Sequence, residues 1–452
     1  MKPYPKYQDS GIEWLGEVPD GWKIVPIKRI VSTKITDGPH ETPEILLDGI
    51  PFISAESIRN DSIDFSKKRG FISTEDHERF SKKYKPLKGD IYIVKSGATT
   101  GKIAIVETDE EFNIWSPLAA IRCNYSKAFS RFAFYFFKSK EFLQSIEISW
   151  NFGTQQNIGM GVIENLPLSL PSLSEQTTIA AFLDLKTAEI DSIIAKKERL
   201  IELYKEEKLA VINHAVTKGL DPDAKMKDSG IEWLGEIPEH WEVKRLKFIK
   251  AQEKNSFVDG PFGSHLKTEH FIDDGDVYVI DSGCITSGDF IKRNEFRTIS
   301  LQHFETIRRS ECKENDIIIA KIGANFGMSG ILPKLDKSSV VSGNSLKLTL
   351  RNDYNLNLTH YQLLNLKQIG IIDIEVKGSA QPALSMQIMS EMPFIKTNMK
   401  EQTSIVQHIE TKCSRIDAII SKFKRQIELL KEYRTALISE AVTGKIDVRN
   451  QI

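Results

Sequence analysis

The sequence predicts an α+β fold in which two mixed α/β domains are joined by two long helices that form an antiparallel coiled coil. Three observations lead to this prediction: a closely matched internal repeat, a heptad-like spacing of apolar residues, and short apolar runs bounded by turns. The chain has 452 residues, of which 40% are hydrophobic and 27% charged, so it is long enough to bury more than one core.

The internal repeat is clearest near the start of each half. Residues 9–30 recur as residues 228–249, with 13 of 22 positions identical. A second block, residues 175–217, recurs as residues 401–443. The stretches between these blocks share a thin skeleton, which consists of residues 37–39 with 259–261, Asp90 with Asp316, and residues 95–98 with 321–324. This contrast predicts a pseudo-two-fold repeat of two modules that keep one frame while their working surfaces differ.

The second repeated block predicts one long helix in each half. Its apolar residues step by 4, 7, 3, 7 and 4 positions, which is the a/d spacing of a coiled coil. The predicted seam consists of Ile190, Ile194, Ile201, Tyr204, Val211 and Ala215 in the first helix and Ile416, Ile420, Ile427, Leu430, Leu437 and Ala441 in the second. At about 1.5 Å per residue each helix would be roughly 60 Å long, which is too long to be buried in one small domain.

Antiparallel packing of the two helices is expected because a domain lies between them in the sequence. The alternative, in which each helix lies on its own domain, stays open. The predicted boundaries are 1–168 for the first domain, 169–219 for the first helix, 220–393 for the second domain, and 394–452 for the second helix and the C-terminal tail.

The middle of each half shows strand-like runs and helical stretches. The strand-like runs are residues 50–53, 90–94 and 102–106 in the first half and 277–280 and 316–320 in the second. Residues 130–145 have a helical pattern, and their phenylalanines are expected in a core. Each middle is therefore predicted to be a mixed α/β domain.

Composition narrows the class of protein. No apolar run is long enough to span a membrane and the start lacks the apolar core of a signal peptide, so we expect a cytoplasmic protein. The four cysteines are scattered, which indicates neither a disulfide framework nor a metal site. A net charge of −1 gives no overall basic excess, although local basic pairs occur, among them residues 82–83 and 308–309. Taken singly, such pairs are more often solvated surface than nucleic-acid contacts.

The sequence carries no catalytic constellation. It lacks the Asn/Asp-Pro-Pro-aromatic tetrapeptide of amino-group methyltransferases, a phosphate-binding loop, a metal-binding histidine pattern and a nucleophile elbow. Residues 97–102 are glycine-rich, but the equivalent residues 323–328 lack the lysine, so we expect a turn between strands. We therefore predict that this chain is not an enzyme and holds no cofactor or metal.

The block DSGIEWLGE(V/I)P, the EQ-T-x-I entry to each long helix and the AVT at its end resemble the specificity subunits of Type I restriction-modification systems. The resemblance spans essentially the whole chain. It implies two target-recognition domains, each of which reads one half of a bipartite DNA target, and a helix pair that sets the spacer between the halves.

The resemblance also implies partners. These are double-stranded DNA, two methyltransferase subunits that bind S-adenosylmethionine and flip the target base, and two restriction subunits that use ATP and Mg²⁺. Two other readings stay open: a fused restriction enzyme with its own methyltransferase, which the missing tetrapeptide opposes, and a coiled-coil scaffold for two protein-binding modules.

Base edges in the major groove are read by exposed polar side chains, so loops of the shared skeleton supply the candidate DNA-binding residues. They are Thr36, Asp37, His40, Thr42, Lys95, Ser96, Thr99, Thr100, Gln155, Gln156 and Asn157 in the first domain, and Ser264, His265, Lys267, Lys321, Asn325, Ser379 and Gln381 in the second.

The candidates differ in expected role. Because Lys95 and Lys321 are shared by both domains, a phosphate contact is expected of them rather than base reading. For Asp37, Asp259 and the glycines we favour turn chemistry. The pairs that differ between the domains are the better candidates for specificity, namely Thr99 with Asn325, Thr100 with Phe326, and Gln156 with Pro382.

Overall fold

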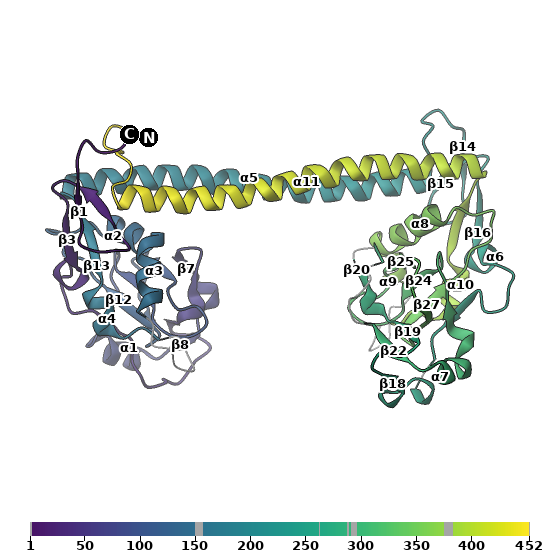
Figure 1. The fold of residues 1–452 in the computed structure, drawn as a ribbon, viewed down its shortest axis with the longest axis horizontal. Coiled ribbons are helices and arrows are strands. Elements are labelled where there is room, and N and C mark those ends of the chain that lie inside the picture. The colour runs from purple at the N-terminus through teal and green to yellow at the C-terminus, as the bar shows by residue number, and fades with distance from the viewer. Residues whose placement is uncertain are drawn as a thin grey trace. The chain divides into compact units, whose positions relative to one another are not determined.

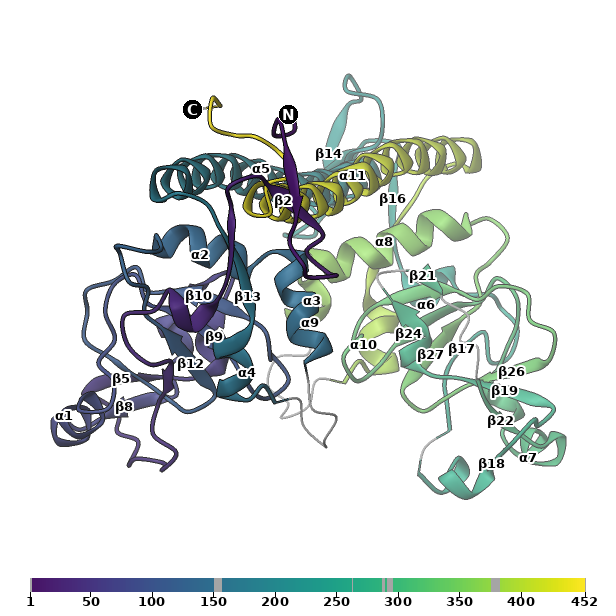
Figure 2. The same cartoon turned by 60° about the vertical axis from the view of Figure 1, so that its left-hand side comes forward.

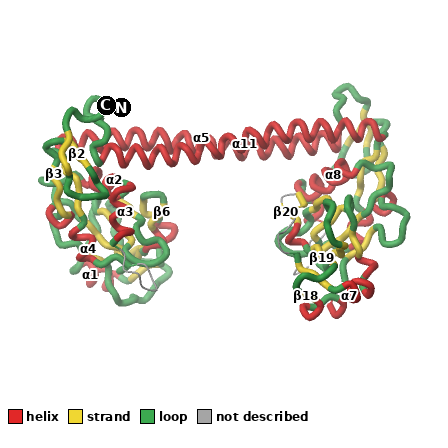
Figure 3. The backbone as a smooth tube through the Cα atoms, viewed as in Figure 1, coloured by secondary structure: helices red, strands yellow, loops and turns green. Residues whose placement is uncertain are grey.

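The computed structural model describes residues 2–149, 157–261, 263–286, 289–290, 296–374 and 383–451. The chain divides into two compact units, which Figure 1 shows with their elements labelled. Unit 1 comprises Met1–Glu198 and Lys424–Ile452, and unit 2 comprises Arg199–Phe423. Short strands and short helices connected by loops make up most of each unit, and the two long helices continue from one unit into the other (Figure 3).

The first repeated block forms the same hairpin in both units. In unit 1, β1 (Tyr7–Asp9) pairs antiparallel with β2 (Glu17–Pro19), and in unit 2, β14 (Met226–Asp228) pairs with β15 (Glu236–Pro238). Each hairpin is followed by a strand that pairs with the segment just before a long helix. These strands are β3 (Lys23–Pro26) with β13 (Pro167–Leu170), and β16 (Glu242–Arg245) with β28 (Pro393–Lys396). The boundaries predicted at 168 and 393 thus fall inside β13 and β28.

The middle of unit 1 contains two sheets. The first has the order β10-β9-β12-β4, with β4 (Thr36–Asp37), β9 (Ile91–Val94), β10 (Ile103–Ile105) and β12 (Leu118–Ile121). The second has the order β11-β5-β8, with β5 (Ile50–Ile53), β8 (Gly70–Ile72) and β11 (Asn113–Ile114); β6 (Ile58–Arg59) and β7 (Ser62–Ile63) form a separate hairpin. The helices are η1 (Ile27–Arg29), η2 (Ala55–Ser57), η3 (Phe65–Lys67), α1 (Thr74–Ser81), α2 (Ser130–Phe137), α3 (Lys140–Ile148) and α4 (Met160–Asn165).

Unit 2 repeats this plan with different residues. Its first sheet has the order β17-β27-β24-β25, with β17 (Phe257–Asp259), β24 (Ile317–Ala320), β25 (Ser329–Ile331) and β27 (Ser345–Leu348). Its second has the order β18-β22-β19-β26-β23, with β18 (Phe271–Ile272), β19 (Val277–Ile280), β22 (Arg297–Ile299), β23 (Glu311–Cys312) and β26 (Ser338–Val341); β20 (Ile285–Thr286) pairs with β21 (Asp289–Phe290). The helices are α6 (Leu246–Ile249), η4 (Gly263–His265), η5 (Thr268–His270), η6 (Ser282–Cys284), α7 (Leu301–Thr306), η7 (Arg308–Ser310), α8 (Leu356–Gln368), α9 (Ile371–Ile374) and α10 (Met386–Glu391).

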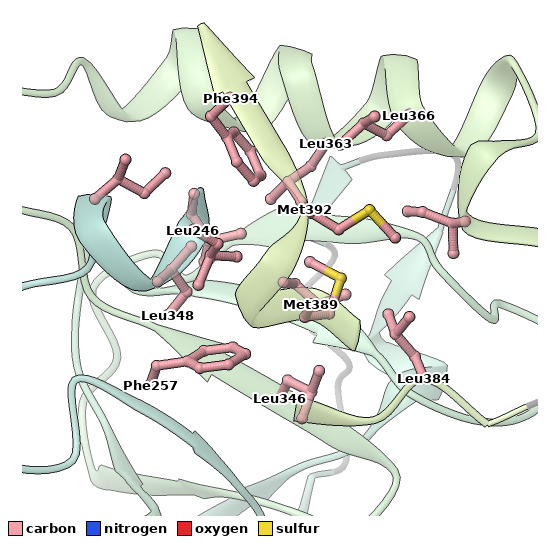
Figure 4. Packing of buried hydrophobic residues seen from close by; sticks show 14 of the residues in the cluster. Leu246, Phe257, Leu346, Leu348, Leu363, Leu366, Leu384, Met389, Met392 and Phe394 are labelled. Atoms are coloured by element: carbon pink, nitrogen blue, oxygen red, sulfur yellow. The ribbon is translucent and has the colours of Figure 1, made fainter. Parts of the chain in front are cut away.

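The central strand of each first sheet has buried side chains throughout. All four residues of β9 and all four of β24 are buried, which explains why their sequences are continuous apolar runs rather than alternating ones. In unit 2 this strand packs into a core with Leu246, Phe257, Leu363 and Phe394 (Figure 4). Burying each such side chain contributes about 1.5–3 kcal/mol, so the apolar middles account for the compactness of the units.

The long helices are α5 (Leu173–Lys218) and α11 (Met399–Val442), and they pack antiparallel within each unit. In unit 1 the Lys197 amine of α5 donates to Gln426 of α11 at 2.7 Å. In unit 2 Lys208 donates to Asp417, and the rings of Tyr204 and Phe423 lie 6.0 Å apart. Partner numbers fall along α11 as they rise along α5, which confirms the predicted antiparallel coiled coil.

The predicted seam is buried along most of its length. Buried are Ile190, Ile194, Ile201, Ala215, Ile416, Ile420, Ile427, Leu437 and Ala441, whereas Tyr204, Val211 and Leu430 are half-buried. The long helices also lie against the rest of the units. In unit 2, α8 runs beside α11 (Figure 2) and its N-cap Asn355 donates its backbone N–H to Gln402 at 2.7 Å, and in unit 1 the backbone N–H of Phe129 donates to Gln176 of α5 at 2.8 Å. Packing of a long helix on its own domain, the alternative left open by the sequence, thus occurs in addition to the coiled coil.

Candidate nucleic-acid interface

An Asp-Gly-Pro turn at the end of β4 gathers three basic side chains around one carboxylate. Asp37 is buried, and its carboxylate lies 2.7 Å from the Lys83 amine, 2.9 Å from the Lys95 amine and 3.2 Å from Nε2 of His40. Burial alone would raise the pKa of Asp37, but the hydrogen bonds from Lys83 and Lys95 outweigh it and hold the pKa below its usual value. Asp37 is therefore the charged centre of the turn.

Glycine is required directly after this aspartate because another part of the backbone passes very close. A Cβ atom on Gly38 would lie 2.0 Å from the carbonyl oxygen of Ile114. In unit 2 a Cβ atom on Gly260 would lie 2.1 Å from the carbonyl oxygen of Ser342. The glycine thus fixes the turn against the neighbouring strand end in both units, as the prediction of turn chemistry expected.

The same turn in unit 2 has the same charges. Asp259 accepts a hydrogen bond from Lys321 at 3.2 Å and one from Arg309 at 2.7 Å. Lys321 stands where Lys95 stands in unit 1, one residue after the central strand of the sheet. The two units therefore hold equivalent clusters of one carboxylate between two cations.

A hollow lies beside each turn. In unit 1 its volume is about 370 Å³, and its lining includes His40, Arg79 and Lys83. In unit 2 its volume is about 380 Å³, and its lining includes His265 and Arg309. Both hollows are bounded by the Gly-Pro of the turn and by the segment that follows a short helix, α1 in unit 1 and α7 in unit 2.

The glycine-rich segments 97–102 and 323–328 are turns between antiparallel strands, as predicted. They connect β9 to β10 and β24 to β25, and both begin with a glycine at φ +99°. In unit 1 the Thr100 hydroxyl donates to the Gly97 carbonyl at 2.7 Å, and in unit 2 the Asn325 amide donates to the Ser282 carbonyl at 3.0 Å. Thr100 and Asn325, which belong to two different pairs of specificity candidates, are thus both held by contacts within their own unit.

A distant segment comes to each of these turns. The backbone N–H of Ile158 donates to the carbonyl of Lys95 at 2.8 Å, and that of Leu384 donates to the carbonyl of Lys321 at 3.0 Å. Ser96 also forms an isolated bridge with Asn157. The structure thus brings Asn157 to the Lys95 turn. The candidates Gln155, Gln156, Ser379 and Gln381 lie outside the described residues, as does Pro382.

The remaining candidates differ in exposure. His40 and Thr42 are exposed on the loop after the first turn, whereas Thr36, Ser96 and Thr99 are half-buried. In unit 2, Ser264, His265 and Lys267 are exposed. The exposed residues can reach a ligand without any rearrangement of the fold.

For Lys95 and Lys321 the geometry favours an internal role over the phosphate contact that the sequence predicted. Their side chains are 13% and 11% exposed, and each amine is paired with the aspartate of its turn. A buried amine held by a carboxylate stabilises the loop, and moving it to an external phosphate would leave that carboxylate short of a partner.

Sequence reasoning missed Lys83 and Arg309 as members of the site. Both belong to basic pairs that were interpreted as solvated surface when taken singly. A signal was nevertheless present, because Lys83 and Arg309 are separated by the same 226 positions as Lys95 and Lys321. Matched offsets in a diverged repeat would have shown that the two pairs are equivalent.

Other chemistry is limited in the part of the chain that the structure describes. Within it no group of three or more metal-ligating side chains is found, and no helix is long and apolar enough to cross a bilayer. All four cysteines are buried, and burial raises the pKa of Cys123 and of Cys312 to about 12. These thiols are therefore poor nucleophiles.

Comparison with known proteins identifies the family. The family described as Type I restriction modification DNA specificity domain matches residues 19–203 and, a second time, residues 238–429. The chain belongs to this family. It is thus a DNA-specificity subunit of the Type I restriction-modification class, and the resemblance found in its repeated blocks is confirmed.

Specificity subunits match this chain at low identity, two of those compared over nearly the full length. The Type I restriction enzyme MjaVIII specificity subunit of Methanocaldococcus jannaschii is 22% identical, over 96% of this chain and 95% of its own. The EcoKI specificity subunit of Escherichia coli is 21% identical, over 95% of this chain and 90% of its own. The putative MjaX specificity subunit of M. jannaschii is 29% identical, but over only 51% of this chain and 53% of its own.

Solved structures agree on the fold. A chain from a study of complex assembly and conformational transition of the type I R-M system has a TM-score of 0.70 at 14% identity, over 95% of this chain and 99% of its own. The HsdS subunit from Thermoanaerobacter tengcongensis has a TM-score of 0.53 at 14% identity, over 95% of this chain and 98% of its own. The predicted α+β fold class is confirmed.

Proposed function

We propose that this specificity subunit reads a bipartite DNA target, one half with each recognition domain, and that the α5–α11 pair sets the spacer. The observation that carries the proposal is the pair of equivalent turn sites, in which an identical Asp-Gly-Pro frame is surrounded by different exposed side chains. A shared frame serves a shared task, such as docking on duplex DNA, and the differing side chains serve different half-sites.

Base reading is assigned to the exposed or variable candidates. In the first domain these are His40, Thr42, Thr99 and Thr100, and in the second Ser264, His265, Lys267 and Asn325. Histidine, threonine and asparagine can donate to or accept from base edges in the major groove. Gln155, Gln156, Asn157, Ser379 and Gln381 belong to the same proposal, because Asn157 adjoins the Lys95 turn.

The proposal assigns no reaction to this chain. Two methyltransferase subunits with S-adenosylmethionine would carry out the methyl transfer, and two restriction subunits with ATP and Mg²⁺ would cleave the DNA. The complex would act in the cytoplasm. Support for such partners comes from the relative whose structure concerns complex assembly of a type I R-M system.

The test is co-expression of this chain with a methyltransferase subunit in a host without related systems, followed by single-molecule methylation sequencing. We expect a bipartite adenine-methylated motif only when both chains are present. Methylation by this chain alone would contradict the proposal. Failure to form a complex, together with no motif, would favour the scaffold alternative.

A further inference from the structure

Lys83 and Arg309 occupy the same place in the two recognition domains. Each follows a short helix that comes directly after a strand of the second sheet, α1 after β8 in the first domain and α7 after β22 in the second. Each reaches back to the aspartate of the Asp-Gly-Pro turn at 2.7 Å. The two residues share a charge, a partner and a hollow, although the segments that carry them have little sequence in common.

Each cluster carries an excess of positive charge. In the first domain the single carboxylate of Asp37 lies between Lys83 and Lys95, and in the second Asp259 lies between Arg309 and Lys321. One negative charge cannot neutralise two positive ones. Because the inner lysines are almost buried, the excess is presented by Lys83 and Arg309, whose side chains are 48% and 61% exposed.

Among the described residues, the charges that line the hollows do not remove this excess. In the first hollow Arg79 pairs with Glu41 at 2.9 Å, so that pair adds no net charge, and its second partner, Asp76, does not line the hollow. Beside Arg309 the adjacent Arg308 pairs with Glu305 at 3.0 Å. Each cluster, counted with the described residues that line its hollow, therefore retains a net charge of about +1, which suits a singly charged anionic group.

The donors keep capacity for a ligand while they are held in place. The Lys83 ammonium has three N–H groups, of which one donates to Asp37 and another to the Gly38 carbonyl at 3.0 Å. The guanidinium of Arg309 uses one terminal nitrogen for Asp259 and has further N–H groups on the exposed side chain. Anchoring on the rigid turn lowers the entropy that each side chain would lose on binding.

What the hollows do not share indicates what they recognise. Phe80 and Tyr84 line the first hollow, whereas Thr306 and Ser310 stand at the equivalent positions of the second. Residues common to both domains cannot distinguish two half-sites. The common cation therefore fits the part of DNA that is the same at every site, which is the phosphodiester backbone.

We propose that each hollow binds one phosphate of the DNA backbone, through Lys83 in the first domain and through Arg309 in the second. This inference rests on the proposed DNA-reading function and adds to it a matched pair of sequence-independent anchors. The anchors fix each domain on the duplex, while the variable loops beside them read the bases.

The test measures DNA affinity of the complex with the methyltransferase subunit as a function of salt. The variants are Lys83→Gln and Arg309→Gln, because glutamine keeps a donor for the aspartate but removes the charge. For each variant we expect weaker binding and a slope of log K against log salt that is shallower by about 1. For the double variant we expect a slope that is shallower by about 2. The methylated motif should stay the same.

Matched controls come from the adjacent residues. Lys82→Gln and Arg308→Gln remove a positive charge next to each site from a side chain that does not line the hollow, and the slope should change less. Lys83→Arg and Arg309→Lys keep the charge and should retain the wild-type slope. Melting curves of all variants show whether the fold is intact.

The outcomes separate the two levels of the proposal. If the wild-type complex methylates a bipartite motif but Lys83→Gln and Arg309→Gln leave affinity and slope unchanged, the phosphate sites are wrong and the proposed function stands. A changed motif in one half would also overturn the inference, since it would make the cation a base reader. If the wild-type complex has no bipartite motif, the proposed function itself fails.

Discussion

The carboxylate of Asp61, at the tip of the β6–β7 hairpin, forms an ion pair with Arg434 of α11, in which Nη2 of Arg434 lies 3.3 Å from Oδ2 of Asp61. Arg434 also donates to Asp191 of α5 at 3.2 Å, and Lys138 of the domain pairs with Asp61. Within unit 1 one short hairpin is thereby tied to both long helices. These contacts couple the position of the recognition domain to the helix pair.

Replacing Asp61 with asparagine should destabilise unit 1. Lys138 is 10% exposed, and burial lowers its pKa while Asp61 opposes that effect, so removal of the carboxylate leaves a buried cation poorly paired. We expect a loss of roughly 1–3 kcal/mol in the free energy of unfolding, measured by denaturant titration. Asp109→Asn is the control, because Asp109 is 81% exposed and its pair with Lys88 spans 3.4 Å. An equal loss in both variants would contradict the coupling.

Substituting the glycine of either turn should be strongly destabilising. Gly38→Ala and Gly260→Ala place a methyl group within 2.1 Å of a backbone carbonyl oxygen. The neighbouring backbone must move, so we expect losses of about 2 kcal/mol or more and lower melting temperatures. Gly161→Ala in α4 is the matched control, since nothing lies within 4 Å of its added Cβ and helix propensity favours alanine. If the melting temperature of Gly161→Ala fell as far as those of the turn variants, the close approach of the backbone carbonyl to the turn glycine would not explain the loss of stability.

The contribution of Asp37 should depend on pH. Its folded-state pKa lies below the unfolded value, so the stability it provides is present above the unfolded pKa of about 3.9 and is lost as pH falls through the folded pKa. Asp37→Asn should therefore be less stable than the wild type near neutral pH, and the gap should shrink below about pH 4. Unfolding free energies of both proteins across this range test the sign. A gap that widens on acidification would refute it.

Changing an exposed loop residue should alter one half of the methylated motif. His40→Ala removes a side chain that is 72% exposed and lines the first hollow, so the half-site read by the first domain should become less strict. Methylation sequencing of the co-expressed complex measures both halves in one experiment. His265→Ala is the reciprocal variant and should relax the other half. Loosening of both halves by either variant would argue against independent readers.

Lengthening the helix pair should change the spacer and not the half-sites. A heptad inserted after Ala195 of α5 and another after Leu430 of α11 keep the a/d seam in register. Each adds about 10 Å, close to the length of about three base pairs, and the methylated motif should gain a spacer of that order. Altered half-sites with an unchanged spacer would show that the helices do not act as the ruler.

The architecture could be predicted from the sequence because the long helices and the buried strands each leave a local pattern of apolar residues. The a/d spacing of Ile190, Ile194 and Ile201 is visible in the chain itself, and continuous apolar runs mark the buried strands. The site was predicted less completely. A phosphate contact was expected of Lys95, and Lys83 was not among the candidates, since only the fold shows that both amines pair with Asp37 and that Lys95 is nearly buried while Lys83 is half exposed. Ion pairs between residues far apart in the chain follow no periodic pattern, so the sequence does not indicate which charges will meet.

In unit 1, residues near the start of the sequence form hydrogen bonds with residues near its end. The backbone N–H of Asp447 donates to the Lys2 carbonyl at 2.8 Å, the Tyr7 hydroxyl donates to the Gly444 carbonyl at 3.0 Å, and α11 supplies the second long helix of the unit. Unit 2, in contrast, is one continuous segment. During synthesis unit 2 can therefore complete its contacts while the ribosome still holds residues 424–451. The domain that is translated first is thus the last to be finished, because its closing contacts require residues 424–451.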